Sequence, residues 1–214
     1  MAVSHPIFSR LFARASVAMD QAGMAEHRAR LVAGLRGRVV EVGAGNGRNL
    51  AHYPPGVTGV VAVEPEPRLR ALARAAAPGA RVPVTVVAGL AEALPVADGA
   101  ADGAADAVVL SLVLCSVPDQ AVALGEARRV LRPGGELRFY EHVVAQTPGL
   151  RRAQRLADAT LWPLFCASCH TARDTVAAIR AAGFEVTALD RFRFPPTGLP
   201  APASPHVLGT AIRA

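Results

Sequence analysis

The feature that most constrains the fold is an alternation of short β-branched runs with helical patterns. The first run, residues 38–42, leads into the glycine-rich sequence EVGAGNG at 41–47. Further runs occupy 59–64, 84–87, 107–110 and 136–141, and helical patterns lie between most of them. Strands that alternate with helices form a mainly parallel sheet with helices on both faces. The sequence therefore predicts an α/β protein with a doubly wound sheet.

The C-terminal part breaks this alternation. Two strand patterns, 184–190 and 206–212, are joined by the proline-rich segment 194–205 and have no helix between them. Two strands without a crossover helix pair in antiparallel fashion. We therefore expect a seven-stranded sheet that is mainly parallel and carries an antiparallel C-terminal edge hairpin.

The N-terminal segment has a helical pattern. Phe8, Leu11 and Phe12 recur at three- and four-residue spacing, and Gly23 divides the pattern into two helices. We expect residues 1–37 to form a helical extension, either a packing element or a lid, and residues 38–214 to form one ligand-binding domain.

Composition limits the class of partner. The net charge of +6 raises the question of nucleic acid, but all 23 basic residues are arginines scattered along the chain, so we expect no nucleic-acid partner. With three cysteines, no export signal and no apolar run long enough for a transmembrane segment, we expect a cytoplasmic protein with reduced thiols. A tandem Asp-Gly-Ala-Ala repeat over 98–106 is typical of an exposed turn. The sequence leaves the oligomeric state open.

The glycine-rich loop predicts a ligand site. Ligands of such sheets bind beyond the carboxyl ends of the strands, and glycines let a ligand approach the backbone. Alone, the loop could also be an ordinary tight turn. Glu64, however, ends the next strand, where a carboxylate can accept hydrogen bonds from ribose hydroxyls. Together these features indicate a nucleoside-binding unit.

The loop's details favour a ligand without phosphate. The spacing of Gly43, Gly45 and Gly47 differs from the G-x-G-x-x-G pattern of dinucleotide sites. The preceding Glu41 is unfavourable to a phosphate and suits an amine. S-adenosylmethionine carries an amine and a sulfonium and has no phosphate.

Three motifs in order give the chain a family resemblance. The segment 39–47, then Glu64, then LRPGG at 131–135 before a strand resembles the Rossmann-like class I S-adenosylmethionine-dependent methyltransferases. Within that class, the strings YPPG at 53–56 and LVLCSV at 112–117 are similar to the small thiol-methyltransferase-like group, with a methyltransferase type 11 domain. The resemblance implies S-adenosyl-L-methionine as cofactor and methyl transfer to a small acceptor, foremost a thiol.

The resemblance also assigns site residues. Those implied to bind the cofactor follow the strands: Glu41, Gly43, Ala44, Gly45, Asn49, Glu64, Leu90, Ala91, Ser111 and Leu112. Many members of the family have an acid where this chain has Leu90. The adenine amine would then be contacted by the backbone or by Glu92.

Methyl transfer from a sulfonium is an in-line displacement whose rate comes mainly from positioning. A thiol is partly ionised near neutral pH, so a general base is optional. If the enzyme uses one, His142 at the end of a strand is our candidate catalytic residue; a structural role for it is an equal alternative. We expect Cys115, Trp162, Cys169 and His170 to line the acceptor pocket.

Other functions remain open. The sequence CASCH at 166–170 matches the c-type haem attachment motif, but that attachment follows export. The two cysteines and the histidine of this motif fall one ligand short of a closed zinc site. Together with His142 or Cys115 they could hold a metal, but we expect none. The alternatives are methylation of a quinone or lipid precursor, and a non-catalytic nucleoside- or haem-binding protein.

Overall fold

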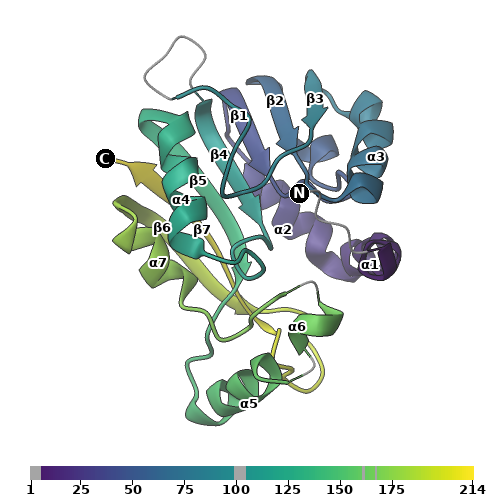
Figure 1. Ribbon diagram of the computed structural model, residues 1–214, viewed down its shortest axis with the longest axis vertical. Coiled ribbons are helices and arrows are strands. Elements are labelled where there is room, and N and C mark those ends of the chain that lie inside the picture. The colour runs from purple at the N-terminus through teal and green to yellow at the C-terminus, as the bar shows by residue number, and fades with distance from the viewer. Residues whose placement is uncertain (1–5, 99–104, 161, 167) are drawn as a thin grey trace.

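The computed structural model describes residues 6–98, 105–160, 162–166 and 168–214. Its centre is a seven-stranded sheet in the order β3-β2-β1-β4-β5-β7-β6 (Figure 1). The strands are β1 (Gly37–Val42), β2 (Val57–Val63), β3 (Val84–Val87), β4 (Ala105–Ser111), β5 (Leu131–His142), β6 (Phe184–Arg193) and β7 (Pro205–Arg213). The Asp-Gly-Ala-Ala repeat lies largely outside the described residues.

The pairing of the strands confirms the predicted fold class. β1 pairs in parallel with both β2 and β4, β2 with β3, and β4 with β5. β7 is antiparallel to β5 and to β6, which forms the edge. Because the strand order reverses between β1 and β4, the loops after these two strands border the crevice in which such sheets bind ligands.

Helices surround the sheet. They are α1 (Pro6–Met19), α2 (Ala25–Val32), α3 (Pro67–Ala76), α4 (Gln120–Val130), α5 (Pro148–Asp158), α6 (Trp162–Phe165) and α7 (Thr175–Ala181). Side chains of Glu66, Asp119 and Asp174 accept backbone N–H bonds at the starts of α3, α4 and α7. Between β1 and β2 there is only a single 3-10 turn, Leu50–His52, because Pro54 and Pro55 prevent it from continuing as a helix.

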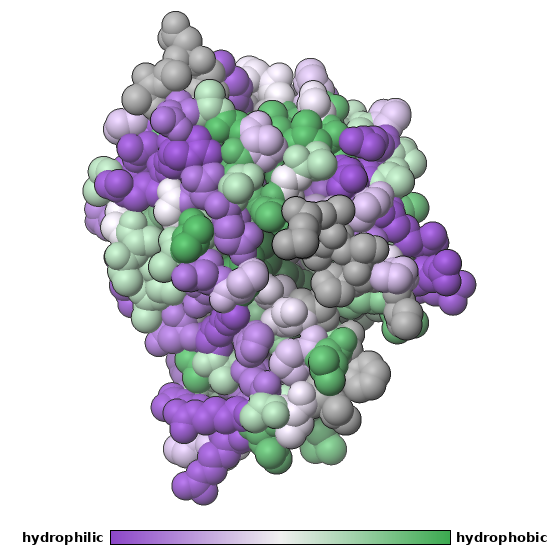
Figure 2. All heavy atoms as spheres, in the orientation of Figure 1, coloured by the Kyte–Doolittle hydropathy of each residue, from purple (hydrophilic) through white to green (hydrophobic). Residues whose placement is uncertain are grey.

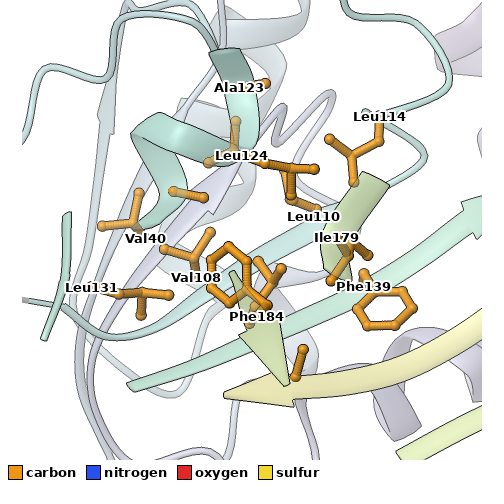
Figure 3. Close-up of a cluster of buried hydrophobic side chains, with 14 of the residues drawn as sticks. Val40, Val108, Leu110, Leu114, Ala123, Leu124, Leu131, Phe139, Ile179 and Phe184 are labelled. Atoms are coloured by element: carbon orange, nitrogen blue, oxygen red, sulfur yellow. The ribbon is translucent and has the colours of Figure 1, made fainter. Parts of the chain in front are cut away.

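Successive residues of the central strands point to opposite faces, so the protein has two hydrophobic cores. Val40 of β1 packs on one face with the buried side chains of α4 and α7, among them Leu124 and Ile179 (Figure 3). Val39 packs on the other face with Leu31 of α2. Burial on both faces fixes the register of the strands and so the positions of the residues that follow them.

The N-terminal helices are joined across a bend. Residues Asp20–Met24 form a π-helical segment in which Gly23 has a φ of 110°. Glycine adopts such a φ at little cost, whereas other residues are strained there. The predicted break at Gly23 is confirmed, and it sets the direction of α1.

Figure 2 shows polar residues spread over most of the face it draws, with smaller hydrophobic patches between them. No helix within the described ranges is long and apolar enough to cross a membrane.

Candidate active site

The glycine loop is tightly bound to the sheet. The N–H groups of Gly43 and Ala44 both donate to the carbonyl of Val63, at 2.8 and 3.1 Å. Gly43 and Gly45 have φ values of 67° and 57°. A Cβ atom on Gly43 would lie 2.5 Å from Val113 Cγ2. The glycines are therefore required both by backbone conformation and by close packing.

Glu64 holds this loop from the end of β2. Its carboxylate accepts hydrogen bonds from the N–H of Gly45 at 2.7 Å and of Glu66 at 2.9 Å. Burial raises the pKa of Glu64, against the lowering effect of these two donors. Two oxygens with four lone-pair positions leave this carboxylate room for further donors.

Glu41 lies beneath the loop in a buried polar network. Its carboxylate accepts hydrogen bonds from Asn49 Nδ2 and from the hydroxyl of Tyr53, both at 2.9 Å. Arg28 of α2 donates to Asn49 and forms an ion pair with Asp20. Burial raises the pKa of Glu41 to about 7. The network ties the N-terminal helices to the loop.

The loop after β4 is held by a second acidic side chain. Leu112 has a φ of 59°, a strained value for leucine that often marks functional sites. The fully buried Glu141 accepts hydrogen bonds from the N–H groups of Val113, Leu114 and Cys115 at 2.9, 3.0 and 3.3 Å. Burial raises the pKa of Glu141 to about 7. This carboxylate fixes where Leu112 and Cys115 lie.

A narrow cleft of about 20 Å³ lies between the two loops, with room for about one water molecule. Its walls are Phe12, Arg28, Glu41, Gly43, Ala44, Gly45, Asn46, Arg48, Asn49, Ser111 and Leu112. The cleft thus brings together seven of the ten residues predicted to bind the cofactor. Glu64, Leu90 and Ala91 are outside it, although Glu64 contacts its wall through Gly45.

Two buried oxygens near these loops have no hydrogen-bond partner within the described part of the chain. One is Ser111 Oγ, which borders the cleft, and the other is Glu92 Oε1, beside the short bridge between Leu90 and Ala93. Buried polar atoms are nearly always hydrogen-bonded. Both atoms are therefore candidates to bind a polar ligand.

A larger cavity of about 370 Å³ adjoins the cleft. It shares Phe12 and Leu112 with the cleft and is mostly apolar. Its other walls are Phe8, Met19, Met24, Cys115, Ser116, His142, Trp162, Cys166, Cys169, Phe194, Pro195, Ala201, Ala203, Ser204 and His206. The structure therefore brings Cys115, Trp162, Cys169 and His142 to one cavity and leaves His170 outside it.

Two of these cysteines meet His142 at the cavity wall. Cys169 Sγ lies 3.4 Å from His142 Nδ1, and the ligand atoms of Cys115, His142 and Cys169 all lie within 4.8 Å of one another. The neighbouring Cys115 thiol, and then His142, hold the pKa of Cys169 well below its usual range. Contact with Cys169, followed by burial, raises the pKa of Cys115.

A second histidine borders the same cavity. The ring of His206 on β7 lies 4.6 Å, centroid to centroid, from that of His142. Its Nδ1 is 2.8 Å from the carbonyl of Ser204, which accepts only a protonated nitrogen, so Nε2 is the unprotonated atom. Burial, followed by repulsion from His142, lowers the pKa of His206 to about 3.

Sequence reasoning missed some of the lining residues. Phe12 and Arg28 come from the N-terminal helices, and His206 comes from the last strand. The amphipathic pattern around Phe12 indicated that one face of the helix is buried, but not which part of the chain that face packs against. His206 was not predicted to line the cavity, because its position depends on where β7 lies in the sheet, between β5 and β6.

Comparison with known proteins identifies the family. A family model described as a methyltransferase domain matches residues 40–139. The human thiol S-methyltransferase TMT1A is 33% identical over 178 residues, which cover 82% of this chain and 70% of that protein. The chain belongs to the class I S-adenosylmethionine-dependent methyltransferases. The expected resemblance to the thiol-methyltransferase group is confirmed.

Solved structures of methyltransferases share the fold. A S-adenosylmethionine-dependent methyltransferase from Thermotoga maritima superposes with a TM-score of 0.70 at 23% identity, over 97% of this chain and 99% of its own. A geranyl diphosphate methyltransferase in complex with S-adenosylmethionine has a TM-score of 0.65 at 14% identity, over 90% and 85% of the two chains.

The cofactor of this methyltransferase is S-adenosylmethionine, and the residues present fit it. Gly43 and Gly45 border the cleft without a side chain to fill it, and the unpartnered Ser111 Oγ at the same cleft is free to bind a polar group. Glu64 lies where a ribose would be bound, at the end of the second strand.

Proposed function

We propose that this methyltransferase acts on a small thiol that binds in the 370 Å³ cavity. The observation that carries the proposal is the shared wall: Phe12 and Leu112 border both the cofactor cleft and the cavity. An acceptor in the cavity is thereby next to the methionine end of the cleft. S-adenosylmethionine supplies a methyl group on a positively charged sulfur, ready for in-line displacement.

The size and lining of the cavity support a small, largely apolar acceptor. Its volume is near the lower end of the range of about 300–1,000 Å³ for ligand pockets. Phe8, Met24 and Phe194 contribute apolar surface. A thiol fits such a site better than a charged acceptor does, because burial of an unpaired charge is costly. The names of the curated relatives point to the same class of acceptor.

The chain's own residues then have distinct tasks. Glu41, Ser111 and the glycine loop bind the methionine part, Glu64 the ribose, and Leu90, Ala91 and Glu92 the adenine. His142 is the group at the cavity wall that can take the thiol proton. Positioning of the two sulfurs, more than proton transfer, supplies the rate.

We further propose that α1 is a lid. The ring of Phe12 lies 3.2 Å from the position that a Cβ on Gly45 would occupy, so α1 covers the loop. The cleft beneath is too small for the methionine part of the cofactor. A movement of α1 about the bend at Gly23 would widen this cleft for the cofactor. The lid would then be the part of the 1–37 extension that precedes Gly23, whereas α2 stays bound to the domain of 38–214 through Arg28 and Asn49.

We also propose that the protein works in the cytoplasm. Cys115 and Cys169 are neighbours at the cavity wall. In the cytoplasm such thiols are kept reduced, as the proposed site needs them to be.

The test is incubation with labelled S-adenosylmethionine and a panel of small thiols, phenols, quinones and lipid precursors, with products identified by mass spectrometry. We expect S-methyl products. If only quinones or lipid precursors are methylated, the acceptor is one of these and not a thiol. A Soret band in the purified protein would point to the haem alternative. His142→Ala should lower kcat/KM for thiols, whereas His170→Ala, outside the cavity, should not.

A further inference from the structure

Three side chains at the cavity wall form a ligand set for a metal ion. Cys115 lies in the loop after β4, His142 at the end of β5 and Cys169 after α6. Two thiols and an imidazole are the donors that Zn²⁺ prefers, and catalytic zinc sites use three protein ligands and leave the fourth position open. We propose that Cys115, His142 and Cys169 bind a zinc-class divalent ion whose open position faces the acceptor cavity.

The distances fit this assignment. Tetrahedral zinc, with bonds of about 2.3 Å to sulfur and about 2.0–2.1 Å to nitrogen, sets its ligand atoms about 3.5–3.8 Å apart. Cys169 Sγ and His142 Nδ1 are already 3.4 Å apart, and all three ligand atoms lie within 4.8 Å of one another. Adjustment by about 1 Å, within the range of side-chain rotation, closes the site.

The backbone around the cluster is fixed on several sides. Glu141 accepts a hydrogen bond from the N–H of Cys115, and the N–H of His170 donates to the Cys115 carbonyl at 2.7 Å. The N–H of Cys169 donates to the Cys166 carbonyl at 3.0 Å. Cys115 and Cys169 are buried. A ligand set held by its surroundings in this way loses little entropy when the ion binds.

An independent observation indicates that the cavity side of the cluster receives a polar group. His206 borders the cavity, is 3% exposed, and its Nε2 has no hydrogen-bond partner within the described ranges. Because Nδ1 carries the proton, Nε2 is an acceptor. It can accept a hydrogen bond from a water on the metal or from a polar group of the acceptor.

The inference rests on the proposed function and gives it a means of activating the thiol. Coordination of R–SH to the metal releases a proton to solvent and leaves R–S⁻ in the fourth position. A sulfur lone pair then forms the new S–CH₃ bond while the methyl–sulfonium bond breaks and its electron pair stays on the departing thioether. With the ion bound, His142 is a ligand, and the metal replaces it as the group that promotes ionisation.

The test begins with metal binding by the full chain. Reduced protein, stripped with a chelator and loaded with Zn²⁺, should retain one ion per chain after gel filtration. Cys115→Ser and Cys169→Ser should each weaken binding by more than ~100-fold, because even outer-sphere partners of metal ligands account for about 10–100-fold. Cys166→Ser is the matched control: Cys166 borders the same cavity but is outside the cluster, and this variant should keep the ion.

Two measurements on the unchanged chain guard against misfolded variants. Co²⁺ in place of Zn²⁺ should give the intense visible bands of a tetrahedral site and a thiolate charge-transfer band that grows when a small thiol is added. Zn²⁺ should also protect Cys115 and Cys169, but not Cys166, from alkylation. Failure of reduced protein to bind either ion, or equal binding by all three serine variants, overturns the site. If thiols are still methylated in that case, the proposed function stands without a metal; bound metal with no methylated thiol overturns the proposed function instead.

Discussion

The N–H of Gly45 donates a 2.7 Å hydrogen bond to the carboxylate of Glu64, and this bond joins the loop after β1 to the end of β2. The same carboxylate is the one we expect to hold the ribose. One side chain therefore shapes the loop and, in the proposed site, would also contact the ligand, so we expect its removal to affect cofactor binding in two ways.

Glu64→Ala should weaken S-adenosylmethionine binding by about 10- to 100-fold, because hydrogen bonds to a charged group contribute about 1.5–3 kcal/mol. Isothermal titration calorimetry measures the change. Glu185→Gln, on the exposed surface of β6, is the control and should bind normally. Unaltered affinity in Glu64→Ala would contradict the assigned site.

Phe12→Ala should remove the cover that α1 places over Gly45. We expect cofactor affinity to fall by about tenfold, through faster dissociation, because the lost aromatic contact is worth about 1–2 kcal/mol. Stopped-flow fluorescence or surface plasmon resonance separates the two rates. Leu11→Ala changes an exposed residue of the same helix and should leave both rates as they are. Equal behaviour of the two variants would count against a lid.

Gly23→Ala should destabilise the protein by about 1–2 kcal/mol, since alanine is strained at a positive φ. The effect comes from the backbone alone, because the nearest atom to a Cβ at this position is 3.9 Å away. Gly125→Ala, at an exposed and open position inside α4, should instead stabilise by about 0.5–1 kcal/mol. Chemical denaturation gives the free energy of unfolding of both variants. If both lose stability, the effect at Gly23 cannot be ascribed to its positive φ.

His206→Asn should remove a pH dependence of stability. The folded pKa of His206 is about 3, below the usual 6.5, so between these values the unfolded chain binds a proton that the native protein does not. The contribution of the neutral His206 to the stability of the folded protein is therefore complete above pH 6.5 and is lost as the pH falls below that value. From pH 7.5 to 5.0 the wild type should lose about 2 kcal/mol relative to the variant.

The comparison between chains is necessary because buried carboxylates act in the opposite direction. Burial raises the pKa of Glu41 and Glu141 to about 7, which favours the folded protein as the pH falls toward 4.5. These groups are common to both chains and cancel in the difference. Urea denaturation at several pH values measures the difference in the free energy of unfolding between the wild type and His206→Asn. If this difference stays constant with pH, the pKa of His206 is not lowered by folding.

The parts of the site that sequence predicts are those that follow strands. Glu41, Gly43 and Ser111 could be placed at one crevice because parallel strands present their carboxyl ends at one edge. Phe12 and His206 could not, because their neighbours are set by how α1 folds back over the loop and by where β7 enters the sheet. Both the packing of α1 and the place of β7 are set by tertiary structure and cannot be read from the local sequence.

The same distinction applies to the cysteines. The spacing of Cys166 and Cys169 drew attention to a haem motif, yet Cys169 lies with Cys115, far away in the chain. Burial and contact across the sheet decide the partner of a thiol, and its nearest neighbour in the sequence does not.

The wall formed by Phe12 and Leu112 has a consequence for turnover. Phe12, on the helix that we propose as a lid, borders both the cofactor cleft and the acceptor cavity. In the proposed lid arrangement, one opening of α1 releases both the methylated product and the spent cofactor, so the two dissociation steps share one rate. An inhibitor wedged against Phe12 from the acceptor side would then also slow cofactor exchange, although it never touches the cofactor.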